Sequence, residues 1–210
     1  MKLAILTSPN QWFCDFAEKL SVELGCAQIF ENHDDILDSY DVVFILSYHK
    51  IIENSFLSRN KHNIVIHASD LPAGKGWAPF FWQVLEGKSK ITFSMFEATE
   101  GVDDGPIYMQ QELRLNGLEL NKELRVKQAE MQIKMCKNFV DNYSVYRNPH
   151  DQMGVESFYP KRNALDSELD INKTIKEQFN MLRIVDNNEY PAFFYIDGKK
   201  FVLKVYSENS

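Results

Sequence analysis

The amino-acid sequence predicts an α/β fold in which a mostly parallel sheet is flanked by helices. Three observations lead to this prediction: short continuous apolar runs, stretches with apolar residues at helical spacing between them, and turn residues at the boundaries. Residues 3–6 form the first apolar run, and residues 13–24 have helical spacing and end at Gly25. Because strands that alternate with helices are joined by right-handed crossovers, these elements predict a Rossmann-like, mostly parallel sheet.

The remaining elements follow the same alternation along the chain. Further strands are predicted at 27–30, 42–46, 64–66, 91–96 and 107–113. Helices are predicted at 77–85 and at 121–143, the second with its apolar residues on one face. The C-terminal part adds a short helix capped near Asn172 and a β-hairpin, residues 193–196 and 200–206, around Asp197-Gly198.

Length and composition bound the domain organisation. A chain of 210 residues with 44% hydrophobic residues can bury one substantial core. A polar stretch at 147–154 contains Pro149 and has the composition of a linker. We therefore expect a main Rossmann-like domain over residues 1–150 and a C-terminal extension over residues 151–210.

Charge and cysteine content exclude several classes of protein. A net charge of −7 argues against a nucleic-acid partner, because phosphate neutralisation needs an excess of Lys and Arg. The cysteines, Cys14, Cys26 and Cys136, are odd in number and lack C-x-x-C spacing, which predicts reduced, buried thiols and no metal site. The apolar run at the start is too short for a signal peptide or a membrane span. We expect a cytoplasmic protein without a membrane partner.

Two segments carry residues suited to acid–base chemistry. His67 ends the predicted strand at 64–66, where ligands of parallel sheets gather. Asp103 lies in a later loop between Gly101 and Gly105. A histidine titrates near neutral pH, and a carboxylate can hold its charged form, so the two residues are a candidate acid–base pair.

These segments resemble the signature of the formyltetrahydrofolate-dependent formyltransferases. That family has a histidine opening H-x-S-L-L-P-x-x-x-G and an aspartate in a D/E-G-x-D-x-G-x-I loop. The matching residues here are His67, Ser69, Leu71, Pro72 and Gly76, then Glu100, Gly101, Asp103, Gly105 and Ile107. The resemblance implies the formyltransferase fold, 10-formyltetrahydrofolate as co-substrate, catalysis by His67 and Asp103 within residues 1–150, and no metal.

The resemblance has one gap, at the position of the oxyanion donor. The family has an asparagine two residues before the histidine, and this chain has Val65 there. Asn63 lies four residues before His67 on the same face of the strand, so it either replaces that donor or only ends the preceding turn. A backbone N–H is a further alternative, and a non-catalytic folate- and nucleotide-binding homologue is the reading without any donor.

Other residues are candidates for binding. The resemblance places Tyr48 and Ile51, with Asp103, in the folate pocket. Ser69 and Trp77 are candidates for the substrate site. The segment Lys75-Gly76 leads into the predicted helix, so its lysine and backbone N–H groups either hold a phosphate or form a plain turn with a solvated lysine.

The acceptor of the formyl group separates three branches of the family. Methionyl-tRNA formyltransferases carry a further C-terminal barrel domain, and phosphoribosylglycinamide formyltransferases carry a G-x-G-S-N loop where this chain has Thr7-Ser8-Pro9-Asn10. Both branches are disfavoured, the second being kept as the alternative.

The tail resembles the sugar N-formyltransferases. It contains Phe158-Tyr159-Pro160-Lys161-Arg162, then Arg183, and a Tyr190-Pro191-Ala192-Phe193 ending, with Asn172 and Ala192 departing from the usual Trp and Gly. Tyr159 is expected to stack on a nucleobase, and Lys161, Arg162 and Arg183 to neutralise a diphosphate.

The sequence therefore predicts formyl transfer to a nucleotide-linked amino sugar. The resemblance favours a UDP-4-amino-4,6-dideoxy-N-acetylhexosamine of the pseudaminic acid type, on the way to a formamido surface or flagellar glycan. The extension at 151–210 is expected to complete the nucleotide-sugar site, and its aromatic hairpin could form a homodimer surface.

Overall fold

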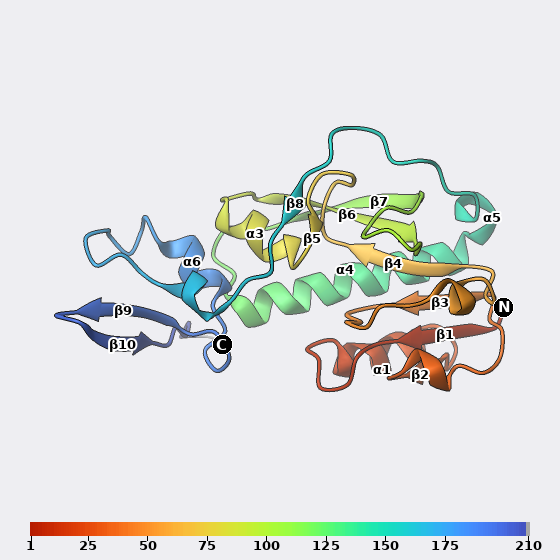
Figure 1. The fold of residues 1–210 in the computed structure, drawn as a ribbon, viewed down its shortest axis with the longest axis horizontal. Helices are drawn as coiled ribbons and strands as arrows, with labels where there is room; N and C mark the ends of the chain where they lie inside the picture. Colours follow the sequence, from red (N-terminus) through yellow and green to blue (C-terminus); the bar gives the residue numbers. More distant parts are fainter. Residues whose placement is uncertain (209–210) are drawn as a thin grey trace.

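The structure, a computed structural model, describes residues 1–208 and is built around a six-stranded sheet of order β2-β1-β3-β4-β6-β7 (Figure 1). Neighbours among the first four strands are parallel, and the last two strands add antiparallel pairings. The mostly parallel α/β sheet predicted from the sequence is confirmed. The strands are β1 (Leu3–Leu6), β2 (Gln28–Phe30), β3 (Val42–Ile45), β4 (Asn63–His67), β6 (Lys90–Glu97) and β7 (Ile107–Arg114).

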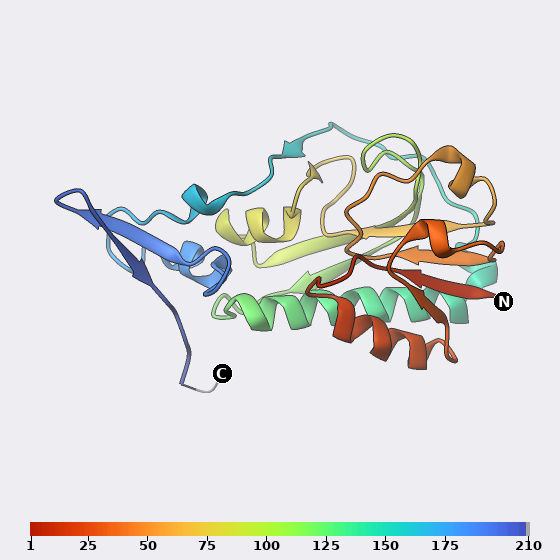
Figure 2. The same cartoon turned by 60° about the horizontal axis from the view of Figure 1, so that its bottom comes forward.

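Helices cover the sheet and bury its apolar residues. The helices α1 (Cys14–Glu23) and α4 (Asn121–Asp141) run along one face of the sheet (Figure 2). The main core lies between them and the strands, and a smaller one lies on the other face under α2 (Asn54–Leu57). Because both faces are covered, the central strands β1 and β3 are apolar throughout, as their sequences indicated.

The predicted helices differ from the observed ones at their ends. The helix predicted from Trp77 is α3 (Pro79–Leu85), because Ala78 has a left-handed φ of 47°. The long helix stops at Asp141, and a separate α5 (Tyr143–Tyr146) follows.

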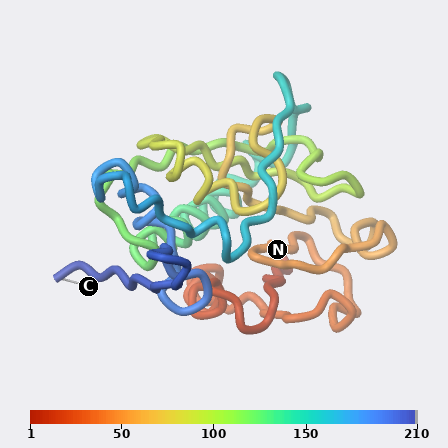
Figure 3. The backbone as a smooth tube through the Cα atoms, turned by 60° about the vertical axis from the view of Figure 1, so that its left-hand side comes forward, coloured from red at the N-terminus to blue at the C-terminus, as the bar shows by residue number. Residues whose placement is uncertain are grey.

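The segment predicted as a linker is instead attached to the body of the domain. We call residues 147–159 the strap, because this segment leaves α5 and passes back across the molecule (Figure 1). His150 pairs with Ile107, and the strap ends as β8 (Phe158–Tyr159), which pairs with β5 (Lys75–Gly76). In Figure 3 the end of the strap runs beside the loop that contains β5. The strap thus joins the start of β7 to β5, the short strand that follows His67.

The C-terminal extension ends in a hairpin that projects from the domain (Figures 1 and 2). Its elements are the 3₁₀ turn Ala164–Ser167, α6 (Phe179–Ile184), β9 (Ala192–Ile196) and β10 (Lys199–Leu203). The predicted helix cap near Asn172 is wrong. Gln178 and Thr174 form side-chain hydrogen bonds within the preceding segment, which holds it in turns until α6 begins.

Three further sequence expectations concern membranes, metals and thiols. Within residues 1–208 no helix is long and apolar enough to span a membrane, and no cluster of His, Cys, Asp and Glu could hold a metal. The three cysteines are unpaired, but Cys26 is exposed, so the expected burial of all three thiols is wrong for that residue.

Candidate active site at the carboxyl edge of the sheet

His67 is the last residue of β4, at the carboxyl edge of the parallel strands. Its Nε2 lies 2.9 Å from the Gly74 carbonyl oxygen and 3.6 Å from Asp103 Oδ2. Because a carbonyl oxygen only accepts, neutral His67 carries its hydrogen on Nε2 and donates it to Gly74. The Nδ1 atom therefore keeps its lone pair and is the nitrogen that can take up a proton.

Asp103 is held in place by its own loop and by a neighbouring one. Its φ of 50° is left-handed, a conformation that Asp tolerates better than most residues. Its Oδ2 accepts a hydrogen bond of 2.8 Å from the Gly76 backbone N–H. Gly105 is required in the same loop, because a Cβ there would lie 1.7 Å from the Glu97 carbonyl oxygen. The structure therefore brings the two predicted catalytic side chains together.

Gln152 of the strap fixes the Asp103 loop from outside. Its Nε2 donates hydrogen bonds of 2.8 Å to the carbonyl oxygens of Asp103 and Gly105. Its sequence neighbourhood is polar and without regular pattern, so nothing in the sequence marked this residue. The contact makes Gln152 a positioning residue for Asp103.

Replacing Gln152 by leucine is expected to lower kcat about tenfold with little change in KM. The two carbonyl groups would lose a donor worth about 0.5–1.5 kcal/mol for each hydrogen bond, and the loop would hold Asp103 less rigidly. Steady-state kinetics of this variant and of Met153→Ala, which removes an exposed strap side chain, are the measurement. Equal kcat in the two variants would contradict the positioning role.

Asn63 is not near His67, so the oxyanion-donor prediction is corrected by its position. It begins β4, and four residues of strand place it about 13 Å from His67 along the chain. Its Nδ2 donates to the Leu57 carbonyl oxygen at 2.9 Å and to Glu97 Oε1 at 3.3 Å. Both amide hydrogens are used, and Asn63 anchors the opposite end of the strand.

The phosphate role predicted for Lys75 is also corrected. Its side chain is 2% exposed and lies 2.6 Å from Asp104 Oδ1 and 2.9 Å from Glu156 Oε1. Burial disfavours the charged amine, but the two carboxylates outweigh this effect and raise the pKa of Lys75. Lys75 therefore joins the Asp103 loop to the strap. The Gly76 N–H is likewise used by Asp103, so it is not free for a phosphate.

Arg183 is buried in an ion pair instead of facing a ligand. It is 2% exposed, and its Nη2 lies 3.1 Å from Glu119 Oε2. Its Nε and Nη1 donate to the Glu119 carbonyl oxygen and to Asn180 Oδ1. Since all three nitrogens have protein partners, the predicted contact with a diphosphate is wrong.

Tyr159 and Arg162 already have protein partners, Tyr159 at α3 and Arg162 within the extension. The Tyr159 ring stacks on Trp82 with centroids 6.1 Å apart, and its hydroxyl lies 2.8 Å from Glu86 Oε1. Burial and the Glu86 carboxylate raise the pKa of Tyr159. Arg162 Nη2 donates to the Asp166 carbonyl oxygen and Ser167 Oγ. The Trp82 ring therefore already occupies one face of Tyr159, and a nucleobase would have to compete with it or stack on the other face.

Trp77 remains an open candidate for substrate contact. Its side chain is 48% exposed, and the His49 ring stacks on it at a centroid distance of 6.3 Å. Lys161 Nζ lies 4.8 Å from the centre of the Trp77 ring. Ser69 is fully buried, and its Oγ has no hydrogen-bond partner among the residues that the structure describes.

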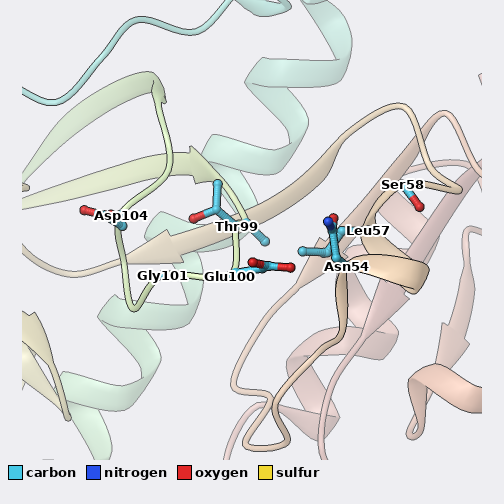
Figure 4. Close-up of a pocket in the computed structure, with 8 residues that line it drawn as sticks. Asn54, Leu57, Ser58, Thr99, Glu100, Gly101 and Asp104 are labelled. Carbon is cyan, nitrogen blue, oxygen red and sulfur yellow. The ribbon is translucent and has the colours of Figure 1, made fainter.

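An open pocket of about 580 Å³ adjoins the Asp103 loop (Figure 4). Asn54, Leu57 and Ser58 of α2 and its end form one wall, and residues 98–101 with Asp104 form the other. The predicted folate contacts lie elsewhere: the Tyr48 hydroxyl is bonded to His33 Nδ1 at 2.6 Å, and Ile51 is 91% exposed. The lining combines apolar Leu57 and Ala98 with carboxylate, hydroxyl and backbone groups, a set that suits a polar heterocycle.

The fold and the site define an α/β protein with a histidine–carboxylate pair at the carboxyl edge of its sheet. The formyl transferase family model matches residues 27–139, and the chain belongs to this family.

The curated relatives are longer proteins. The methionyl-tRNA formyltransferase of Thermosipho melanesiensis is 32% identical over 146 residues, which are 70% of this chain and 47% of that protein. The chain thus spans about half the length of the curated relatives it matches.

Solved structures with the same fold have lower sequence identity. Methionyl-tRNA formyltransferase from Clostridium thermocellum gives a TM-score of 0.82 at 18% identity, covering 100% of this chain and 95% of that one. A 4-N formyltransferase from Francisella tularensis gives 0.73 at 15%, covering 99% and 98%. HypX from Aquifex aeolicus in complex with tetrahydrofolic acid gives 0.72 at 15%, covering 98% and 37%.

Proposed function

We propose that this protein transfers a formyl group from 10-formyltetrahydrofolate to an amine. The observation that carries the proposal is the pairing of His67 and Asp103 at 3.6 Å, on a family fold and next to an open pocket. The pocket walls, Asn54 and Ser58 on one side and Glu100 on the other, are the groups that would hold the pterin (Figure 4). When bound, the folate supplies the formyl carbon, and its N10 gains the proton that the amine loses.

His67 is the group that moves this proton. Its Nδ1 accepts the proton of the attacking amine, while the Nε2–H stays bonded to Gly74 and keeps the ring oriented. Asp103 stabilises the positive charge that then forms on the imidazole. The imidazolium can in turn donate a hydrogen bond to the developing oxyanion, a role that neither Val65 nor Asn63 can take.

The acceptor that we propose is the amino group of a nucleotide-linked sugar, a UDP-4-amino-4,6-dideoxy-N-acetylhexosamine of the pseudaminic acid type. The exposed Trp77 with His49 and Lys161 offers an aromatic and cationic surface of the kind that suits a nucleotide. The net charge of −7 is unfavourable for tRNA. We propose that residues 151–210 complete this site, and that the exposed hairpin side chains form a homodimer surface.

Methionyl-tRNA is the second candidate acceptor. It is favoured by the names of the curated relatives, such as the Thermosipho protein at 32% identity. Glycinamide ribonucleotide is less suited, because Thr7-Ser8-Pro9-Asn10 lacks the glycines that would close around a phosphate.

A formyl-transfer assay separates these candidates. The protein is incubated with 10-formyltetrahydrofolate and one acceptor at a time. The acceptors are UDP-, dTDP- and GDP-linked 4-amino sugars, glycinamide ribonucleotide and methionyl-tRNA, and the mass of each is measured by mass spectrometry. We expect a gain of one formyl group on a UDP-amino sugar. Transfer to methionyl-tRNA alone would replace the acceptor but keep the reaction, and folate binding without transfer to any acceptor would favour a non-catalytic homologue.

A further inference from the structure

A nucleotide-linked acceptor requires cations for its phosphates, and the structure removes most of the predicted ones. Lys75 is enclosed by two carboxylates, and Arg183 by Glu119 and Asn180. Arg162 is bonded to groups of its own turn. These three side chains therefore have few unused N–H donors left for a phosphate. A phosphate bound at the carboxyl edge of the sheet would need another cation.

Arg125, in the second turn of α4, has such unused donors. Its guanidinium lies between two aromatic rings, 4.5 Å from the centre of Trp12 and 4.3 Å from that of Phe81. Its hydrogen bond in the structure is from Nη1 to Gln128 Oε1 at 3.1 Å, on the same helix. The other guanidinium N–H groups of Arg125 have no hydrogen-bond partner among residues 1–208, and such N–H groups are those with which a guanidinium binds oxyanions.

The charge of Arg125 is poorly compensated. Burial between the rings lowers the pKa of its guanidinium to about 10, although Asp186 and Glu189 act in the opposite direction through space. Both acids act on Arg125 only through space, and neither forms an ion pair with it within residues 1–208. Arg125 remains protonated at neutral pH, and a partly desolvated cation without a counter-ion costs free energy unless a ligand supplies the negative charge.

Arg125 also lies on the side of the sheet that faces the substrate edge. Trp12 belongs to the loop after β1, so its ring marks the carboxyl end of that strand. Phe81 belongs to α3, and Gln83 of the same helix donates to the Ala68 carbonyl oxygen, directly after His67. The helix α3 therefore contacts both the guanidinium, through Phe81, and the residue that follows His67, through Gln83.

A second polar group without a partner lies on the same face. Thr7 continues β1, since its N–H donates to the Phe30 carbonyl oxygen, and it follows Ile5 at period two on the α1–α4 face. Its Oγ1 is buried and has no hydrogen-bond partner within the described chain. A donor of this kind beside the β1 loop fits an oxyanion bound nearby.

We propose that Arg125, held between Trp12 and Phe81, binds the phosphate groups of the acceptor and so selects nucleotide-linked amines. This inference rests on the proposed function for the identity of the acceptor. The anion-binding property itself does not depend on turnover, because the free protein already carries the guanidinium in this geometry. Arg125 is thus a specificity residue, separate from the proton transfer at His67.

The test measures anion binding and turnover in matched variants. Arg125→Gln and Arg125→Lys remove the planar fork, with and without its charge, and Lys122→Gln removes an exposed charge from the same helix. Binding of inorganic pyrophosphate and of UDP to each protein is measured by isothermal titration calorimetry. We expect both affinities to fall at least about tenfold in the two Arg125 variants and to stay within about twofold in Lys122→Gln.

Kinetics separate this inference from the proposed function. With an accepted nucleotide sugar, Arg125→Gln should raise the KM for that substrate and leave the KM for the folate and kcat nearly unchanged. If no acceptor is found, the pyrophosphate and UDP titrations still decide the inference. Failure of wild-type protein to bind either anion, binding of a short RNA in preference to UDP, or equal affinities in Arg125→Gln and Lys122→Gln would overturn it. A lower melting temperature with unchanged anion affinity would also overturn it, because Arg125 would then only pack the two rings.

Discussion

Replacing His67 by asparagine is expected to lower kcat by about 10²–10⁴-fold while leaving folate and acceptor affinities nearly unchanged. The asparagine amide is shorter than the imidazole and does not reach the position of Nε2, so the hydrogen bond to the Gly74 carbonyl oxygen, 2.9 Å from Nε2, is lost and the melting temperature is measured alongside. It has no basic nitrogen to replace Nδ1. The loss should therefore appear in the chemical step, and single-turnover formyl transfer measures that step directly.

His150→Asn is the control for this substitution. It removes an imidazole that is exposed and bonded to the Asp151 carbonyl oxygen, with no hydrogen bond or ion pair to His67 or Asp103 in the described structure. We expect its kcat to stay within about twofold of wild type. A His67→Asn variant with wild-type melting temperature and undiminished single-turnover rate would show that another group transfers the proton.

The proximity of His67 and Asp103, the candidate catalytic pair, was predictable because a local sequence feature marks each residue. His67 ends an apolar strand, and ligands of parallel sheets collect at that end. Asp103 lies in a loop that requires Gly105 for a close backbone approach, so the surrounding glycines mark it in the sequence. Their meeting at 3.6 Å needed only the sheet order and the family resemblance.

The predicted phosphate contacts of Lys75 and Arg183 failed because each side chain pairs with a carboxylate far away in the sequence. Lys75 and Arg183 look like solvent-exposed phosphate ligands when each is considered alone. Their carboxylate partners, Glu156 and Glu119, are 81 and 64 residues away. Neither spacing nor composition predicts such a pairing, because it arises from the path of the strap and from the docking of α6. For the same reason the sequence did not indicate the contacts of Gln152 and Arg125, whose partners lie in other elements.

Asn63 shows that two residues on the same face of a strand are not necessarily close enough to act together. Alternation along a strand correctly places Asn63 and His67 on one face, but alternation says nothing of reach. The buried Glu97 and the end of α2 at Leu57 take both amide hydrogens at the far end of β4. Helix boundaries failed for a related reason, since the left-handed Ala78 that delays α3 has no sequence signature.

Asp103→Asn is expected to lower kcat about 10²–10³-fold without unfolding the loop. The asparagine oxygen can still accept the Gly76 N–H, which Asp103 Oδ2 accepts at 2.8 Å. It carries no charge, so the imidazolium that forms on His67 during transfer loses its counter-ion. The effect should fall on kcat measured with saturating folate and acceptor, and the melting temperature should change little.

The neighbouring carboxylate makes a sharp comparison, because Asp104 pairs with Lys75 at 2.6 Å and has no contact with His67 in the described structure. Asp104→Asn removes one of two counter-ions from a buried lysine, which should lower the melting temperature and change kcat by less than about tenfold. The two isosteric variants should thus divide the two properties, activity for Asp103 and stability for Asp104. If instead Asp104→Asn lost turnover while Asp103→Asn kept it, Asp103 would not be the counter-ion of His67. Turnover would then depend on the ion pair between Asp104 and Lys75.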